Sequence, residues 1–335
     1  MKKAFVISYD NIISPENLLA AWEEFLVGKR SKEDVRIFEL HLMENILSLH
    51  RDLKEGSYKQ QPYQAFTISD PKPRNIHKPS VRDRLLHKAI YRKLYPFFDG
   101  VFIHDSYSCR NNKGTHKGFG RVVEIARKVS RNYTQPCWAL KCDIRKFFDS
   151  IDHKILFDSL AEYIVEGKLR WLLAQIIRGF EKNPGKGMPL GNLTSQLFAN
   201  VYMNPLDQFI KHRLKAHYYV RYADDFLILA TKPNDLMGYF IEIWRFLKEE
   251  LKLELHPSKV NLRRLNWGID FVGYVALPHY NLPRAKTVKR AINRLGQMSS
   301  GQLANSLPSY LGHLGHVDSF ELRKSLACTF GNPSD

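Results

Sequence analysis

The segment Tyr218–Ala230 reads YYVRYADDFLILA and contains the clearest structural signal in the chain. Two apolar, β-prone runs, Tyr218–Tyr222 and Phe226–Ala230, flank the short segment Ala223-Asp224-Asp225. This pattern predicts a β-hairpin that carries two adjacent carboxylates at its tip. Asp is also a common turn former, so this pair alone does not separate a catalytic site from an ordinary turn.

A third carboxylate is found upstream, in the segment Trp138–Asp149, which reads WALKCDIRKFFD. A short strand, Trp138–Cys142, is predicted to end at Asp143. Three carboxylates at the ends of adjacent strands form a hard, all-oxygen site that suits two Mg²⁺ ions. Two metals about 3.5–4 Å apart can activate an attacking 3′-oxygen and stabilise a leaving pyrophosphate. The sequence therefore predicts a two-metal site for phosphoryl transfer.

Three motifs resemble the palm of reverse transcriptases in both order and spacing: Asp143 with Phe148, GNLTSQ at Gly191–Gln196, and YADD at Tyr222–Asp225. The resemblance implies a right-hand polymerase that makes DNA on an RNA template with two Mg²⁺ ions. It also implies the metal site, which comprises Asp143, Ile144, Asp224 and Asp225.

The phrase LELHPSK ends at Lys259, where the family keeps a lysine that can protonate the leaving pyrophosphate. By resemblance, the catalytic residues are therefore Asp143, Asp224, Asp225 and Lys259. An ordinary surface lysine is the alternative interpretation of Lys259.

The resemblance further implies contacts to the incoming nucleotide. The phrase KPR-x-I-x-x-P resembles the fingers motif whose basic pair contacts the nucleotide, and Phe148 stands where the family places the ring that excludes a 2′-hydroxyl. The neighbouring Phe147 is interpreted as a core aromatic residue. The implied nucleotide-binding residues are Lys72, Arg74, Phe148, Leu190, Gly191 and Gln196.

Most reverse transcriptases carry Gln-Gly-x-x-x-Ser-Pro where this chain has Leu190-Gly191-Asn192-Leu193-Thr194-Ser195-Gln196. Leu replaces the first Gln, and Gln replaces the final Pro. This double departure marks the reverse transcriptases of diversity-generating retroelements, a subgroup of the group II intron-like bacterial and phage enzymes. The N-terminal helical phrase, SYSCRNNKGTH at Ser106–His116 and SYLGHLGH at Ser309–His316 resemble the same subgroup.

The net charge of +17 favours a polyanionic partner, with nucleic acid as the first choice. No acidic residue occurs from Phe271 to Val317, and basic residues recur there at helical spacing, which predicts a thumb helix that follows a phosphate backbone. FVGY at Phe271–Tyr274 resembles the primer grip. The expected nucleic-acid contacts are Arg110, Lys113, Phe271, Gly273, Arg284, Lys286, Lys289, Arg290 and Arg294.

The expected fold class is α+β, a right-hand polymerase with fingers, a palm whose antiparallel sheet is backed by helices, and a helical thumb. We assign residues 1–60 to an N-terminal helical extension, 61–137 to the fingers, 138–277 to the palm and 278–335 to the thumb. Helices at about residues 152–190 are expected to contribute to the fingers.

The chain has no apolar run of the roughly 18 residues that a membrane span needs, so we expect no membrane contact. Its four cysteines lack paired metal spacing, which favours reduced thiols in a cytoplasmic protein. The resemblance implies that a bacterium or a phage encodes it. His313 and His316 are three residues apart, but two ligands without a nearby cysteine argue against zinc.

The resemblance implies RNA-directed synthesis of error-prone cDNA, changed mainly at adenines, from a template-repeat RNA in mutagenic retrohoming. The implied partners are template RNA, cDNA or primer, dNTPs and a small oligomeric accessory variability protein. One alternative is another stand-alone bacterial reverse transcriptase, of the phage-defence or retron type. A second is a catalytically silent RNA-binding scaffold, which would not need all three carboxylates.

Overall fold

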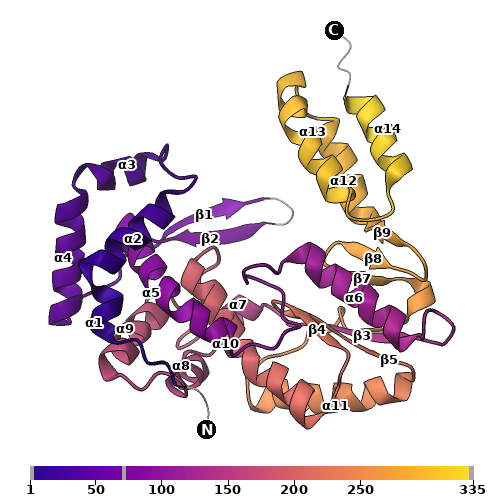
Figure 1. The fold of residues 1–335 in the computed structure, drawn as a ribbon, viewed down its shortest axis with the longest axis horizontal. Coiled ribbons are helices and arrows are strands. Elements are labelled where there is room, and N and C mark those ends of the chain that lie inside the picture. The colour runs from indigo at the N-terminus through magenta and orange to yellow at the C-terminus, as the bar shows by residue number, and fades with distance from the viewer. Residues whose placement is uncertain (1–3, 70–72, 332–335) are drawn as a thin grey trace. The chain divides into compact units, whose positions relative to one another are not determined.

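The computed structural model describes residues 4–69 and 73–331, which combine helices with antiparallel sheets (Figure 1). The α+β class expected from the sequence is confirmed. The chain divides into two compact units. The first comprises Met1–His104, Ile144–Phe209 and Trp244–Glu254, and the second comprises Asp105–Asp143, Ile210–Ile243 and Leu255–Asp335.

The first unit is mostly helical. Its N-terminal part contains α1 (Tyr9–Ile13), α2 (Pro15–Leu26), α3 (Glu33–Leu40) and α4 (Leu42–Glu55). Ser14 caps α2 by accepting the Asn17 N–H, and Pro15 occupies the first helical position, where no N–H is needed. Helices α3 and α4 meet at His41.

A two-stranded hairpin and five more helices complete the first unit. The strands β1 (Gln64–Ile68) and β2 (Arg74–Lys78) pair antiparallel with Gln64 opposite Lys78. The long α5 carries a row of buried apolar residues and packs against α2 and α10. The helices are α5 (Val81–Asp99), α7 (Phe147–Ser150), α8 (His153–Ala161), α9 (Gly167–Arg178) and α10 (Leu193–Gln208).

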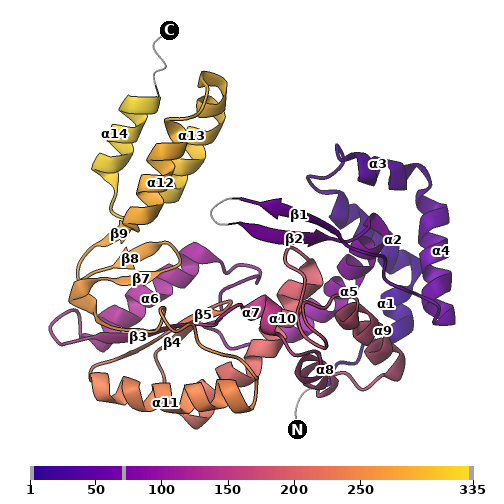
Figure 2. The same ribbon diagram turned by 180° about the vertical axis from the view of Figure 1, so that it is seen from behind.

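The second unit is built on a four-stranded antiparallel sheet of order β4-β5-β3-β6. Helix α6 (Thr115–Val129) packs against β4 and β5, as Figure 2 shows from behind. Helix α11 (Pro233–Glu249) follows β5 in the chain and runs from the second unit into the first. The strands are β3 (Trp138–Asp143), β4 (Tyr219–Tyr222), β5 (Asp225–Ala230) and β6 (Asn261–Arg264).

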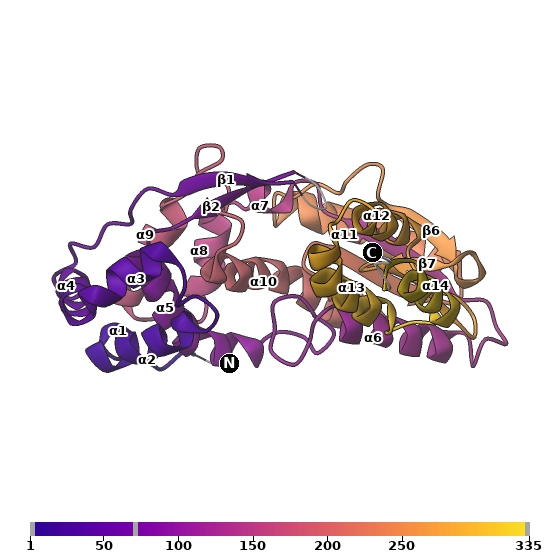
Figure 3. The same cartoon turned by 90° about the horizontal axis from the view of Figure 1, so that it is seen from above.

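A smaller sheet and three helices follow in the second unit. The strands β7 (Ile269–Phe271), β8 (Tyr274–Ala276) and β9 (Asn281–Pro283) form an antiparallel sheet. Three helices, α12 (Ala285–Leu295), α13 (Ser300–Leu314) and α14 (Phe320–Phe330), pack around a leucine core, and Figure 3 shows them nearly end-on. Across the described residues, no helix is both long and apolar enough to traverse a bilayer.

Candidate active site

The register of the larger sheet brings the three predicted carboxylates to one end of it. Asp143, the last residue of β3, lies directly opposite Asp225, the first residue of β5. Tyr222 also pairs with Asp225, so the hairpin turn consists of Ala223 and Asp224 alone. The sequence had placed Asp225 in the turn as well; instead it opens the strand. Side chains opposite each other in such a ladder have Cβ atoms about 4.5–5.5 Å apart.

The Asp225 carboxylate is largely buried. Its side chain is 21% exposed, and its Oδ1 atom is buried without a hydrogen-bond partner. Burial raises the pKa of Asp225 to about 6; Lys141 opposes this shift, and the charges of Asp143 and Asp224 add to it. A buried carboxylate oxygen with an unfilled lone pair is suited to a bound cation, which would lower that pKa.

Two lysines lie beside two of these carboxylates. Lys259 Nζ lies 2.6 Å from Asp143 Oδ1, and Lys141 Nζ lies 3.1 Å from Asp225 Oδ2. Among the described residues, no three His, Cys, Asp or Glu side chains are arranged closely enough to hold a metal ion. The donor set still fits Mg²⁺ chemically, since Asp143, Asp224 and Asp225 supply only oxygen ligands. Ile144 is buried and has only its backbone carbonyl to offer.

Lys259 reaches this edge through the segment that precedes it. The His256 N–H donates to the Asp143 carbonyl over 2.7 Å, and the Lys259 N–H donates to the His256 carbonyl over 3.0 Å. The structure thus brings the predicted catalytic lysine beside the first predicted carboxylate.

Sequence reasoning missed Lys141. Its ammonium contacts Asp225 and also donates to the Asp270 carbonyl over 2.9 Å. A signal was present: Lys141 stands two residues before Asp143, so strand alternation puts both side chains on one face of β3. A lysine inside a short, largely apolar strand is unfavourable unless its charge has a partner, as it has here in Asp225.

Sequence reasoning also missed Arg221, whose side chain is completely buried. Its Nη1 donates to the Ala223 carbonyl over 2.9 Å, and its Nη2 donates to Ser106 Oγ over 3.1 Å. Ala223 has a φ of 55°, in the left-handed region that is costly for residues other than glycine. Arg221 therefore fixes the peptide that immediately precedes Asp224.

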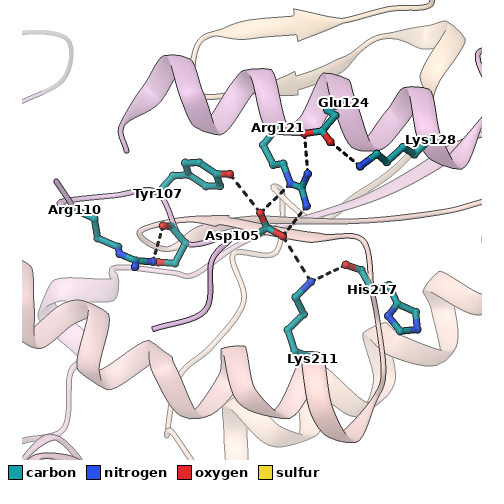
Figure 4. A network of polar contacts seen from close by, with 9 residues as sticks. Asp105, Tyr107, Arg110, Arg121, Glu124, Lys128, Lys211 and His217 are labelled. Carbon is teal, nitrogen blue, oxygen red and sulfur yellow. Dashed lines mark hydrogen bonds and ion pairs between the residues drawn. The ribbon is translucent and has the colours of Figure 1, made fainter. Parts of the chain in front are cut away.

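The segment Asp105–Tyr107 supports Arg221 from the other side. The Arg221 N–H donates to the Asp105 carbonyl, and the Tyr107 N–H donates to the Arg221 carbonyl, each over 2.9 Å. The buried Asp105 carboxylate accepts hydrogen bonds from Arg121 and Tyr107 and lies 3.7 Å from Lys211 Nζ (Figure 4). This network anchors the segment against α6.

The predicted nucleotide contacts belong to the first unit. Gly191 has a φ of 93°, and a Cβ there would lie 3.1 Å from Ile76 Cγ2 on β2, so glycine permits this close approach to the hairpin. Arg74 opens β2 and is exposed, and Lys72 lies outside the described residues.

The two adjacent phenylalanines occupy different environments, as expected. Phe147 is buried in the core, whereas Phe148 is half-buried. The Phe148 carbonyl accepts the Met188 N–H over 2.8 Å, which ties α7 to the loop before Leu190. Leu190 and Gln196 are also half-buried. The role of Phe148 as a sugar gate stays a prediction.

The predicted primer grip is a tight turn between β7 and β8. Phe271 pairs with Tyr274, and the turn residues Val272 and Gly273 have φ values of 44° and 96°. Two positive φ values are typical of a two-residue hairpin turn, but they strain a β-branched residue such as Val272. Such strain is common at functional sites.

The predicted basic contacts differ in exposure and in their neighbours. Lys286, Lys289, Arg290 and Arg294 are exposed on α12, whereas Arg284 pairs with Asp270. Arg110 donates to the Ser106 carbonyl over 3.1 Å, and Lys113 Nζ lies 4.8 Å from the centre of the Tyr107 ring. Arg110 and Lys113 therefore help to hold their own segment, and their contact with nucleic acid stays a prediction.

The two histidine-bearing phrases that resemble one subgroup meet in the second unit. His116 stacks on His316 with ring centroids 3.5 Å apart. Tyr274 Oη lies 3.2 Å from His116 Nδ1 and 3.0 Å from His313 Nδ1. Tyr274 on β8 therefore links the two phrases.

Comparison with known proteins identifies the family of these motifs. Residues 66–276 match the family model for reverse transcriptase (RNA-dependent DNA polymerase). The chain is 24% identical over 266 residues to Protein YkfC of Escherichia coli, covering 68% of this chain and 69% of that protein. It is 24% identical over 319 residues to the group II intron-encoded protein LtrA of Lactococcus lactis, covering 74% of this chain and 51% of LtrA. The chain therefore spans about half of LtrA.

Among solved structures, the chain is similar to a telomerase of Candida albicans, with a TM-score of 0.49 and 12% identity. The match covers 69% of this chain and 48% of the telomerase chain.

Proposed function

Because the chain belongs to the reverse transcriptase family of RNA-directed DNA polymerases, which are nucleotidyltransferases, we propose that it makes error-prone, adenine-mutated cDNA from a template-repeat RNA for mutagenic retrohoming. The polymerase part of the proposal is supported by three carboxylates at one end of the sheet. The retroelement part is supported by one feature above all, the apolar Leu190 beside Gly191. By resemblance, most reverse transcriptases carry glutamine at this position.

Each residue has a distinct role in this proposal. Asp143, Asp224 and Asp225 would hold two Mg²⁺ ions, whose chemistry would be to activate the primer 3′-oxygen and to stabilise charge on the departing pyrophosphate. Lys141 favours the ionised form of Asp225 through its 3.1 Å contact. Lys259, beside Asp143, holds a proton that it can give to the pyrophosphate.

Around the nucleotide, Arg74 and Lys72 contact the triphosphate, Phe148 excludes the 2′-hydroxyl, and Leu190, Gly191 and Gln196 shape the pocket. The proposed fingers, palm and thumb boundaries remain those assigned from the sequence. Proposed partners are template RNA, primer or cDNA, dNTPs and a small oligomeric accessory protein. The second candidate is another stand-alone bacterial reverse transcriptase, a possibility favoured by the similarity to YkfC and LtrA.

Leu190→Gln tests the retroelement role. Leu190 has no donor or acceptor, so correct and mispaired nucleotides should differ less in transition-state energy than they would beside a glutamine. Restoring one good hydrogen bond, worth about 1 kcal/mol, should lower misincorporation opposite template adenine roughly fivefold. The measurement is sequencing of cDNA made by both proteins on one RNA template.

In the same experiment, Leu193→Gln controls for adding a glutamine nearby, on the first turn of α10. An adenine error rate equal to that of the unaltered protein, with activity retained, would move the source of infidelity away from Leu190. A uniformly low error rate in the unaltered protein would favour the second candidate function.

Ser106→Ala tests whether Arg221 positions the carboxylates. The change removes one acceptor from the guanidinium that holds the Ala223 carbonyl. We expect Asp224 to be placed less well, so that half-maximal primer extension needs several-fold more Mg²⁺, from a loss of about 1 kcal/mol. Ser159→Ala, which removes a helix-internal hydrogen bond on α8, is the control. A lower melting temperature with an unchanged Mg²⁺ requirement would reduce Arg221 to a packing role.

A further inference from the structure

A cavity of about 490 Å³ lies in the first unit, between α8, α9 and the loop that follows α9. Phe157, Ala174 and Ile177 supply an apolar wall, and four cationic side chains surround it: Lys154, Arg178, Lys186 and Lys252. Ligand pockets typically measure about 300–1,000 Å³ and combine apolar walls with a few polar groups. The cavity has room for one nucleotide.

The four cations are not equally available. Lys154 pairs with Asp158 at 2.6 Å, and Lys252 pairs with Asp152 at 3.0 Å. Within residues 4–69 and 73–331, the side chains of Arg178 and Lys186 have no ion-pair partner. Arg178 and Lys186 are therefore the cations that are available to pair with a bound anion.

A buried histidine points to a ligand in this cavity. The His153 side chain is 9% exposed, and its Nε2 lies 2.7 Å from the Gly187 carbonyl, so Nε2 carries the hydrogen. Its Nδ1 is buried without a hydrogen-bond partner, and the nearest carboxylate oxygen, Glu181 Oε1, is 3.8 Å away. In the neutral ring this Nδ1 is an acceptor, which matches an amino or N–H group of a nucleobase.

A second cavity of about 250 Å³ shares Lys186 and Lys252 with the first. Its lining adds Arg145 and Lys146, along with Asp149 and Glu254; the Glu254 carboxylate lies 3.4 Å from Arg145. Two adjoining cavities that share cations suit two consecutive nucleotides of a strand. The shared cations can neutralise the phosphate that lies between the two bases.

We propose that these two cavities, here called the α8–α9 groove, bind single-stranded RNA outside the polymerase active site. One base stacks on Phe157 and bonds His153 Nδ1, while Arg178 and Lys186 contact phosphates. All of the lining residues belong to the first unit, whereas Asp143, Asp224 and Asp225 belong to the second. Only the choice of RNA as occupant rests on the proposed function.

The test is the salt dependence of binding to a fluorescently labelled, unstructured RNA oligonucleotide, measured by anisotropy. Each phosphate contact to a single strand contributes about 0.7 to the slope of log affinity against log salt. Arg178→Gln/Lys186→Gln should make the slope shallower by about 1.4. The matched control is Lys54→Gln/Lys168→Gln, which removes two exposed cations of the same unit outside the groove and should leave the slope unchanged.

Phe157→Leu keeps an apolar side chain but removes the ring, and should weaken binding at least about fivefold through lost stacking. Equal slopes for the groove variant and the control would overturn the proposal. Displacement of the RNA by millimolar ATP would also overturn it, since the site would then take free nucleotides. Primer extension on a pre-annealed primer–template reports the polymerase separately, so loss of the proposed function is distinguished from loss of the groove.

Discussion

Asp225→Asn is expected to lower RNA-templated primer extension by at least about 10³-fold, equivalent to several kcal/mol of transition-state stabilisation. Asn preserves the shape of the side chain but removes the charge that would bind the cation. The Oδ1 atom of Asp225 is buried without a hydrogen-bond partner, so a cation bound there would compensate its charge.

The same change is expected to stabilise the metal-free protein at pH 7. The pKa of Asp225 is raised from 3.8 to about 6 by burial, so the folded state binds more protons than the unfolded state between these values. Stability therefore falls as pH rises from about 4 to 6, and the full penalty of the buried charge is present above that window. At most about 3 kcal/mol is involved, so the melting temperature in EDTA should rise by a few degrees.

Thermal melts in EDTA at pH 5 and pH 7 measure this effect beside the extension assay. Asp235→Asn, which neutralises an exposed carboxylate of α11, should change neither activity nor the pH dependence. Full activity of Asp225→Asn would remove it from the catalytic set. A lower melting temperature at pH 7 would show that its charge is compensated in the fold.

Phe148→Ala is expected to admit ribonucleotides. If the half-buried ring packs under the sugar, then a 2′-hydroxyl overpacks the site, which typically costs about 1–3 kcal/mol. Removing the ring should therefore reduce discrimination against ribonucleotides by about 10- to 100-fold, with deoxynucleotide use partly retained. The measurement is the ratio of incorporation efficiencies for the two sugars.

Phe147→Leu is the matched control, because Phe147 is buried in the core beside Tyr202. It should lower the melting temperature and leave the sugar ratio unchanged. If Phe148→Ala also leaves the ratio unchanged, Phe148 is not the gate.

Local sequence patterns predicted the parts of the fold that depend on neighbouring residues. The β4–β5 hairpin follows from two short apolar, β-prone runs beside turn residues. The core position of Phe147 was also predicted. The pattern predicted the strands of the β4–β5 hairpin but not their register, and it placed Asp225 in the turn. In the structure Asp225 pairs with Tyr222 and is therefore the first residue of β5.

The missed residues depend on contacts between distant segments. In the sequence, Arg221 is simply one polar residue of a predicted strand. Its role when buried depends on a hydrogen bond to Ser106, which is 115 positions away in the chain. Lys141 acquires its role from Asp225 across the ladder and from Asp270 in the next sheet. The α8–α9 groove likewise combines a loop, two helices and Lys252. The periodicity of the sequence does not predict contacts between segments that are so far apart in the chain.

The most direct test is incorporation of labelled deoxynucleotide on a primed RNA template, with Mg²⁺ or with EDTA, by the unaltered protein and by Asp224→Asn. Extension should require RNA template and Mg²⁺, and it should fall at least about 10³-fold in the variant. Absence of extension by the folded, unaltered protein, or near-normal extension by Asp224→Asn, would contradict an RNA-directed DNA polymerase built on these three carboxylates.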